Sequence, residues 1–315
     1  MPDTSIAVVI PVGAQRLNNL RMVLASLEAQ TLAPSEVIIV NDGEQSDLRA
    51  WASSHFDRPT YKYIEQPKFE RDLVEIDGSG AVKLLRRGVA DHPRNVGAAL
   101  AASDFLVFLD SDVALHPNSI ARYHEQFTID YKDGIVCGAY NWLPPMQVSE
   151  EEMIADFDRF VEARFPLLPY PEGQPSHNVL PDPRVQFDEK QPNEWTYDDM
   201  ACALACFGGN IGVSKKVFRQ LGEFERWLSA GLVDDGPFGI KAVLHGTPIK
   251  FDRRIIGGHI YHPRDLAYVK KQSAVEMQLI DRYYHLGPWD DGTVKPDLAE
   301  TYARITEPYR KTWAS

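Results

Sequence analysis

A short apolar run that ends abruptly in acidic residues is the feature that most restricts this chain. The five residues of 105–109 are all apolar, and Asp110, Ser111 and Asp112 follow them directly. A run this short, rich in Phe and Val, predicts a strand that is buried on both faces. Such strands belong to α/β sheets, which bind ligands in the crevice beyond the carboxyl ends of their strands. The sequence therefore predicts two carboxylates at the ligand-binding edge of an α/β sheet.

Two uses of Asp110 and Asp112 are open at this point. One residue separates them, so on a regular strand both would point to one face and could converge on a divalent cation or its phosphate ligands. They could equally form turns or cap the helix expected near Pro117. An Asp-x-Asp pair is a weak motif by itself, so the choice depends on the rest of the chain.

The chain alternates between strand and helix patterns. Buried strands are predicted at 6–12, 37–40, 61–64, 105–109 and 134–140, and helices at 16–30, 46–54, 94–103, 117–130 and 149–164. Residues 201–262 return to the same kind of pattern. Alternation of this kind is typical of parallel strands joined by right-handed crossovers. We expect an α/β fold with a mostly parallel central sheet, flanked by helices, in one large domain.

Three segments fit this pattern less well. Residues 66–93 include a basic stretch at 83–87 that favours a helix, and both a loop and a structured insertion are open. Residues 141–200 are rich in proline and predict a loop region around one helix. A helix is expected over 263–285, and the remaining tail has no assignment.

Composition limits the partners and the setting. The net charge of −12 argues against general binding to nucleic acids, which needs a basic surface, and favours a divalent metal beside an anionic substrate. Cys137, Cys202 and Cys206 have no zinc-binding spacing and favour a reduced, cytoplasmic setting. Neither a signal peptide nor an apolar run of about 18 residues is visible, so no transmembrane segment is expected.

Two further residues flank the predicted strands. Asp42 follows the second strand, and Arg94 begins the helix that leads to Asp110. Both should lie at the same edge of the sheet. Asp42 could accept a hydrogen bond from a nucleobase, and Arg94 could pair with Asp42 or contact a base or a phosphate. An Asx-turn and a surface salt bridge are the structural alternatives.

An acidic pair and a histidine pair complete the candidates. Asp234 and Asp235 precede a helix rich in apolar residues, so either could be its N-cap. Capping explains one acid more readily than two, and the more buried acid of a repelling pair could have the raised pKa of a general base. His259 and His262 are either metal ligands or packed histidines.

A series of short motifs follows a specific order: Ile10-Pro11-Val12, Val40-Asn41-Asp42-Gly43, Arg94-Asn95-Val96-Gly97, Phe108–Asp112, Gly208-Gly209-Asn210, Leu221–Phe224, Asp234-Asp235 and Gly258-His259. This order resembles that of the inverting GT-A glycosyltransferases of family 2. The later part is similar to the galactosyl- and N-acetylgalactosaminyltransferase type of C-terminal segment. The resemblance covers roughly residues 5–140 and 205–262.

The resemblance implies a GT-A, Rossmann-like fold and a hexosyltransferase. Its nucleotide-sugar-binding half would be 1–140, its acceptor-binding and catalytic half 141–262, and its C-terminal helix and tail 263–315. The donor would be a nucleotide-diphosphate sugar, with a UDP-sugar favoured, and the cofactor Mn²⁺ or Mg²⁺. The sugar and the acceptor, whether a glycan, a peptide or a small molecule, stay open.

The resemblance also implies roles for single residues. Those that match the donor-binding positions are Pro11, Val12, Asp42, Arg94, Asp110 and Ser111. Asp112 and His259 match the metal ligands, with His262 as a competitor for the second place. Asp235 matches the general base, and Asp234 assists it, although Asp-Asp stands where Glu-Asp or Glu-Asn is usual.

Two other functions stay open on the sequence. A nucleotidyltransferase on a related sheet would need a Gly-rich basic loop after the first strand, whereas 11–16 supplies one glycine and one arginine. A non-catalytic nucleotide-sugar-binding protein is disfavoured because both acidic pairs are intact. Trp142 and Trp195 could stack on an acceptor sugar, although core packing is the more common use of tryptophan.

Overall fold

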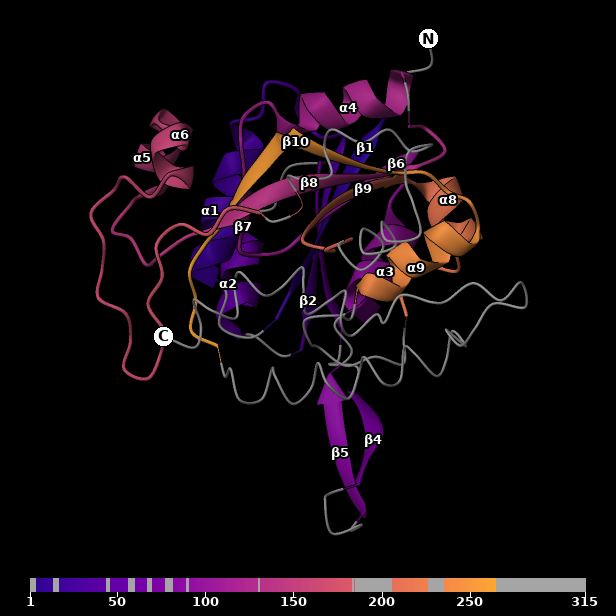
Figure 1. The fold of residues 1–315 in the computed structure, drawn as a ribbon, viewed down its shortest axis with the longest axis horizontal. Coiled ribbons are helices and arrows are strands. Elements are labelled where there is room, and N and C mark those ends of the chain that lie inside the picture. The colour runs from indigo at the N-terminus through magenta and orange to yellow at the C-terminus, as the bar shows by residue number, and fades with distance from the viewer. Residues whose placement is uncertain are drawn as a thin grey trace, which may run out of the picture.

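A mixed sheet forms the centre of the molecule (Figure 1). The computed structural model describes residues 4–13, 17–43, 46–55, 60–66, 70–76, 82–88, 91–129, 131–182, 184, 206–225 and 235–264. Within these ranges eight strands pair in the order β3-β2-β1-β6-β9-β8-β10-β7. Their bounds are β1 Ile6–Val12, β2 Glu36–Asp42, β3 Tyr61–Gln66, β6 Phe105–Leu109, β7 Val113–Leu115, β8 Ile135–Trp142, β9 Asn210–Ser214 and β10 Ile249–His259.

Strand direction brings the carboxyl ends of six of the described strands to one edge of the sheet. β1 is parallel to both β2 and β6, and β2 is parallel to β3. β9 runs antiparallel to both β6 and β8, and β10 is parallel to β8. The short β7 pairs antiparallel with the end of β10. The carboxyl ends of β1, β2, β3, β6, β8 and β10 therefore share an edge, and β7 and β9 start from it.

Helices cover both faces of this sheet. The helices are α1 Leu17–Glu28, α2 Ser46–His55, α3 Asp91–Leu100, α4 Ser119–Ile129, α5 Glu150–Ala155, α6 Phe157–Val161, α8 Lys215–Gln220 and α9 Gly236–Leu244. Along β1, Val8 and Ile10 pack in the core beneath α1, α2 and α4, whereas Ala7 and Val9 pack in the core beneath α3, α8 and α9. Alternation of side chains along a strand explains why a continuous apolar run serves two cores.

The close approach of α3 to the sheet depends on a glycine. A Cβ atom on Gly97 would lie 2.3 Å from Cγ1 of Val9 and 3.3 Å from Cγ2 of Val40. Any larger residue at this position would therefore push the helix off β1 and β2. Since Arg94 lies one turn earlier on α3, this contact also fixes where its side chain meets the edge of the sheet.

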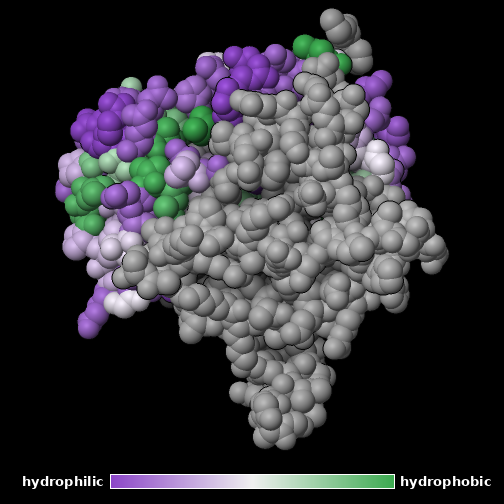
Figure 2. All heavy atoms as spheres, in the orientation of Figure 1, coloured by the Kyte–Doolittle hydropathy of each residue, from purple (hydrophilic) through white to green (hydrophobic). Residues whose placement is uncertain are grey.

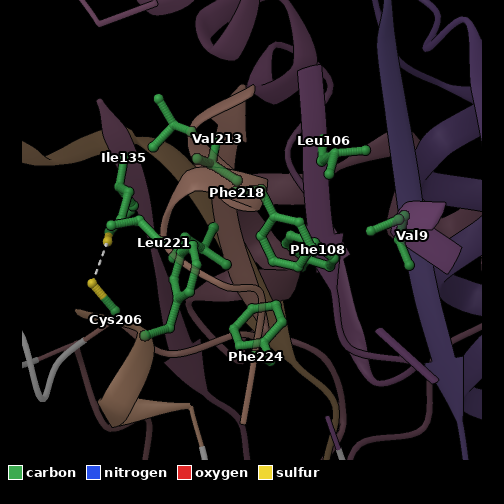
Figure 3. Packing of buried hydrophobic residues seen from close by; sticks show 14 of the residues in the cluster. Val9, Leu106, Phe108, Ile135, Cys206, Val213, Phe218, Leu221 and Phe224 are labelled. Carbon is green, nitrogen blue, oxygen red and sulfur yellow. Dashed lines mark hydrogen bonds between the residues drawn. The ribbon is translucent and has the colours of Figure 1, made fainter. Parts of the chain in front are cut away.

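Aromatic rings join the end of β6 to the helices on the α3 side (Figure 3). The ring of Phe108 lies 5.1 Å from that of Phe218 and 4.9 Å from that of Phe224, centroid to centroid. Phe224 also packs 4.8 Å from Phe238 of α9. The amide of Asn95 donates to the Phe224 carbonyl and accepts from the Phe224 N–H, both at 3.0 Å. This cluster ties α3, α8 and α9 to the strand that precedes Asp110.

The structure differs from the sequence-based expectation at two places. The helix favoured at 83–87 is wrong: β4 (Glu70–Ile76) and β5 (Val82–Gly88) form an antiparallel hairpin, so the structured insertion is the correct alternative. Non-local pairing overrides the local helix preference here. The helix expected at 149–164 is interrupted at Asp156, which caps α6 by accepting a hydrogen bond from the N–H of Arg159.

The surface that can be followed in Figure 2 is largely hydrophilic, with apolar patches on the side where Figure 1 shows α5 and α6. Large apolar side chains in and after these helices are exposed, namely Ile154, Leu167 and Leu168. Among the helices that the structure describes, none combines the length and the apolar character that crossing a bilayer requires. The expected helix at 263–285 lies outside the described residues, apart from its first two positions.

Candidate active site

The predicted site residues gather at the shared strand edge. Val12 ends β1, and Asp42 ends β2, where its carboxylate accepts a hydrogen bond from Gln66 at 3.1 Å. Pro11 sits one residue before the end of β1, opposite Val40 of β2. This placement agrees with the crevice expected for a ligand of an α/β sheet.

Arg94 is the centre of a charged cluster beside this edge. Its Nη2 donates to Asp110 and its Nη1 to Asp91, both at 2.7 Å. The guanidinium is buried, with its carbon 5.8 Å from the centre of the Phe224 ring. The structure thus pairs Arg94 with Asp110, and not with Asp42, the partner that the sequence suggests. Paired in this way, the carboxylate of Asp110 has a defined orientation.

Asp91 is a member of this cluster that the sequence analysis missed. Its side chain is almost fully buried, and burial raises the pKa of its carboxyl group, although the charge of Arg94 opposes the shift. The spacing of Asp91 and Arg94 on one helix, three residues apart, is the signal that could have revealed the pair. Asp91 and Asp110 therefore accept from different nitrogens of the Arg94 guanidinium.

The two glycines before β9 leave room for these side chains. A Cβ atom on Gly208 would lie 3.1 Å from the Arg94 guanidinium, and one on Gly209 would lie 2.7 Å from Oδ2 of Asp110. The carbonyl of Gly209 also accepts a hydrogen bond from the N–H of Asp110 at 3.2 Å. The loop can therefore lie against the acidic turn only because it lacks side chains.

Asp235 is joined to this loop immediately before α9. Its buried carboxylate accepts a hydrogen bond from the backbone N–H of Gly208. Burial raises the pKa of Asp235 to about 6, against the opposing effects of the Arg94 charge and of this hydrogen bond. A carboxyl group with this pKa is ionised near neutral pH yet basic enough to take a proton.

Asp112, His259 and His262 form a second cluster, whose ligand atoms lie within 4.8 Å of one another. Nε2 of His259 is 3.6 Å from Oδ1 of Asp112, and Nε2 of His262 is 3.3 Å from Oδ2. On the sequence alone the two histidines are competitors for one ligand position, but the structure brings both to the same carboxylate. One carboxylate and two imidazoles fit a divalent transition metal, and the imidazoles favour Mn²⁺ over Mg²⁺.

The pairing of β7 with β10 builds this cluster. His259 lies opposite Val113, the residue after Asp112, and the N–H of Ile260 donates to the carbonyl of Asp112 at 2.7 Å. A Cβ atom on Gly257 would lie 2.8 Å from Cγ1 of Val113, and one on Gly258 would lie 2.6 Å from the Phe160 ring. Both glycines are therefore needed for β10 to deliver His259 to the acidic turn.

The proline-rich segment supplies a buried ion pair that contacts β8 and Phe207. Arg184 donates to Asp182 through Nη2 at 2.6 Å and to the carbonyl of Gly138 at 2.8 Å, and both charged side chains are almost fully buried. The guanidinium also stacks 4.4 Å from the centre of the Phe207 ring, next to Gly208. This pair is absent from the sequence-based candidates because the sequence does not reveal that both side chains are buried.

Trp142 ends β8 opposite His259, and its indole ring lies 6.1 Å from the imidazole. Together with His177, Tyr261 and others it lines a pocket that contains the two histidines of the metal cluster. Ser111 is buried in the acidic turn. Asp234, Trp195 and Cys202 lie outside the described residues.

The mixed eight-stranded sheet with its flanking helices is the GT-A glycosyltransferase fold. Among solved structures, that of S. aureus TarS matches with a TM-score of 0.54 at 15% identity, covering 98% of this chain and 43% of that chain. Two structures of S. aureus TarS 1-349, the second in complex with UDP, give TM-scores of 0.53 and 0.52 at 15% identity, covering 98% of this chain and 73% and 72% of those chains.

The chain also resembles the chondroitin synthase of Pasteurella multocida (strain Pm70). The two are 24% identical over 267 residues, a match that covers 82% of this chain and 25% of that protein. The chain therefore spans about a quarter of the length of this relative. No family model matches the chain.

Proposed function

We propose that this chain is a metal-dependent, inverting glycosyltransferase that takes a hexose from a UDP-sugar. The observation that carries the proposal is the convergence of two clusters at one edge of a GT-A sheet: the carboxylate with two imidazoles, and the Arg94 cluster that includes Asp110 and Asp235. A solved TarS structure contains UDP, and the curated relative is named a chondroitin synthase. Both names support a UDP-sugar donor, and the second supports a glycan acceptor.

In the proposed donor site, Asp42 hydrogen bonds to the base, while Pro11 and Val12 form the floor beside it. Asp110 and Ser111 contact the sugar-nucleotide. Asp112, His259 and His262 would hold Mn²⁺ or Mg²⁺, which supplies positive charge to a leaving diphosphate. A galactosyl or N-acetylgalactosaminyl donor is the finer part of the proposal, and it rests on the resemblance of the later motifs alone.

Asp235 is the proposed general base. Its carboxylate takes the proton of an acceptor hydroxyl while that oxygen attacks the anomeric carbon, and the bond from that carbon to the diphosphate oxygen breaks in the same displacement. Attack from the side opposite the leaving group inverts the anomeric configuration. The N–H of Gly208 fixes the orientation of the base, and Asp234 is proposed to assist it.

The test is incubation with single UDP-sugars and Mn²⁺, with separate assays for released UDP and released pyrophosphate. Slow UDP release that stops on addition of EDTA supports the proposal and names the donor. The control is Asp112→Ala, which should abolish this release while the circular dichroism spectrum stays that of the folded protein. Pyrophosphate release would instead indicate a nucleotidyltransferase, and tight UDP-sugar binding without any release would indicate a binding protein.

A further inference from the structure

Arg264 contacts both histidines of the proposed metal site. Its Nη2 lies 2.9 Å from Nε2 of His259, and its Nε donates to Nε2 of His262 at 3.4 Å. An arginine side chain carries only hydrogen-bond donors. Both imidazoles therefore present a lone pair on Nε2, and Arg264 uses the two lone pairs at once.

A metal ion at this site needs the same lone pairs. The Nε2 atoms that face Arg264 are also those that lie 3.6 Å and 3.3 Å from the two carboxylate oxygens of Asp112. A single nitrogen lone pair cannot accept a hydrogen bond and coordinate a metal simultaneously. Arg264 and a metal ion are consequently alternative partners of the two imidazoles.

Two hydrogen bonds hold the backbone of Arg264 beside the proposed metal site. The amide of Gln174 donates to the Arg264 carbonyl at 3.0 Å and accepts from the Arg264 N–H at 3.1 Å. Residues 174 and 264 both line the pocket that contains His259 and His262. A guanidinium displaced from the imidazoles thus stays beside the site, where a dication would repel it unless an anion lies between them.

We propose that Arg264 couples metal binding to binding of the diphosphate. When it hydrogen bonds to His259 and His262, it opposes metal coordination; when a nucleotide diphosphate is present, its guanidinium moves to the phosphate oxygens, which it can contact through two parallel N–H groups. The diphosphate therefore assists metal binding twice, by coordinating the ion and by removing its competitor. This inference rests on the proposed metal and donor sites.

The test is a Mn²⁺ titration of the full chain, with and without UDP, followed by the electron paramagnetic resonance signal of free Mn²⁺. Arg264→Gln keeps an amide donor but removes the charge. It should bind Mn²⁺ alone about tenfold more tightly than the natural chain, because a hydrogen bond from a charged donor contributes roughly one tenfold step or more. The factor by which UDP improves Mn²⁺ affinity should fall by about the same amount, because in Arg264→Gln the diphosphate no longer has a charged competitor to remove; by linkage, Mn²⁺ should improve UDP affinity by the same reduced factor.

The matched control is Arg122→Gln on α4, which removes one positive charge from a half-exposed arginine that pairs with Glu125. It should leave both Mn²⁺ affinities unchanged. Equal or weaker Mn²⁺ binding by Arg264→Gln, with binding still abolished in Asp112→Ala, would overturn the role of Arg264 and leave the metal site standing. Absence of Mn²⁺ binding in every variant would remove the metal site and this inference with it.

Discussion

The backbone N–H of Gly208 donates a hydrogen bond to the buried carboxylate of Asp235. Gly208 belongs to the loop that enters β9, whereas Asp235 lies immediately before α9. The same loop packs against Arg94, because a Cβ atom on Gly208 would lie 3.1 Å from the guanidinium. One glycine therefore connects the proposed base to the charged cluster around Arg94.

Asp235→Asn should lower kcat by about 10²–10⁴-fold, the usual contribution of general-base catalysis. The amide keeps the size of the side chain and can still accept from Gly208, so UDP affinity measured by calorimetry should change little. Asp234→Asn is the neighbouring comparison; it should cost less in rate and little in stability, because Asn caps a helix about as well as Asp does. Wild-type turnover in Asp235→Asn would exclude it as the base.

The pH profile of kcat should rise with a midpoint near 6. Burial raises the pKa of Asp235 to about 6, and only the deprotonated carboxylate can accept the hydroxyl proton. Activity should therefore fall as the pH drops through 6 and level off above it. Steady-state rates from pH 5 to 8 provide the measurement, and a flat profile over this range would argue against proton transfer to Asp235 as the limiting step.

Gly209→Ala should reduce kcat/KM by about 10²-fold through a displaced carboxylate. The added Cβ would lie 2.7 Å from Oδ2 of Asp110, so Asp110 must leave its position beside Arg94 or the loop must shift. A double-mutant cycle with Asp110→Ala separates these cases. If Asp110 transmits the effect, Gly209→Ala should cost little in the Asp110→Ala background; full additivity would contradict this route.

Arg184→Met should lower the free energy of unfolding by about 3–5 kcal/mol, because it leaves Asp182 buried without its cation. Arg254→Met is a matched control, since Arg254 makes the same pair of contacts with the aspartate two residues before it, but its side chain is 48% exposed. Asp252 is buried like Asp182, so the comparison isolates the burial of the arginine; the loss should be smaller for Arg254→Met, because water can reach the carboxylate where the half-exposed guanidinium is removed. Urea denaturation measures both, and equal losses would show that burial does not decide the contribution of the pair.

Glu36→Gln should remove about 3 kcal/mol of stability at neutral pH. Burial alone would raise the pKa of Glu36, but hydrogen bonds from Lys62, Ser103 and Ala102 outweigh it and lower the pKa from 4.5 to about 2. A lowered folded pKa gives stability that is present above 4.5 and is lost as the pH falls towards 2. Urea denaturation should therefore show that the difference in unfolding free energy between wild type and Glu36→Gln shrinks as the pH falls over this range.

The exposed Glu162 provides a control for this measurement, because it pairs with Arg164 at 2.7 Å but its side chain is 59% exposed. Glu162→Gln should show a small stability change with little dependence on pH, since exposed ion pairs contribute little. If the difference in unfolding free energy between wild type and Glu36→Gln stayed constant from pH 7 down to pH 3, the lowered pKa would be contradicted.

The strands of the sheet were predicted well where an apolar run in the sequence is buried on both faces in the structure. Val8 and Val9 point to opposite cores, so an uninterrupted apolar run can only be a strand covered on both faces. The edge carrying Asp42 and Asp110 followed from strand direction alone. The hairpin of β4 and β5 was missed as a strand pair because its pairing joins residues that no local pattern links.

The sequence by itself determined the α/β alternation, the acidic turn after β6 and the candidate residues at the sheet edge, because periodicity and strand polarity are local properties. Only the tertiary structure decided that Arg94 pairs with Asp110 and Asp91, that Gly208 holds Asp235, and that His259 and His262 share Asp112. These contacts join residues on separate elements, and their distances and burial, which set the pKa values, exist only once the elements have packed.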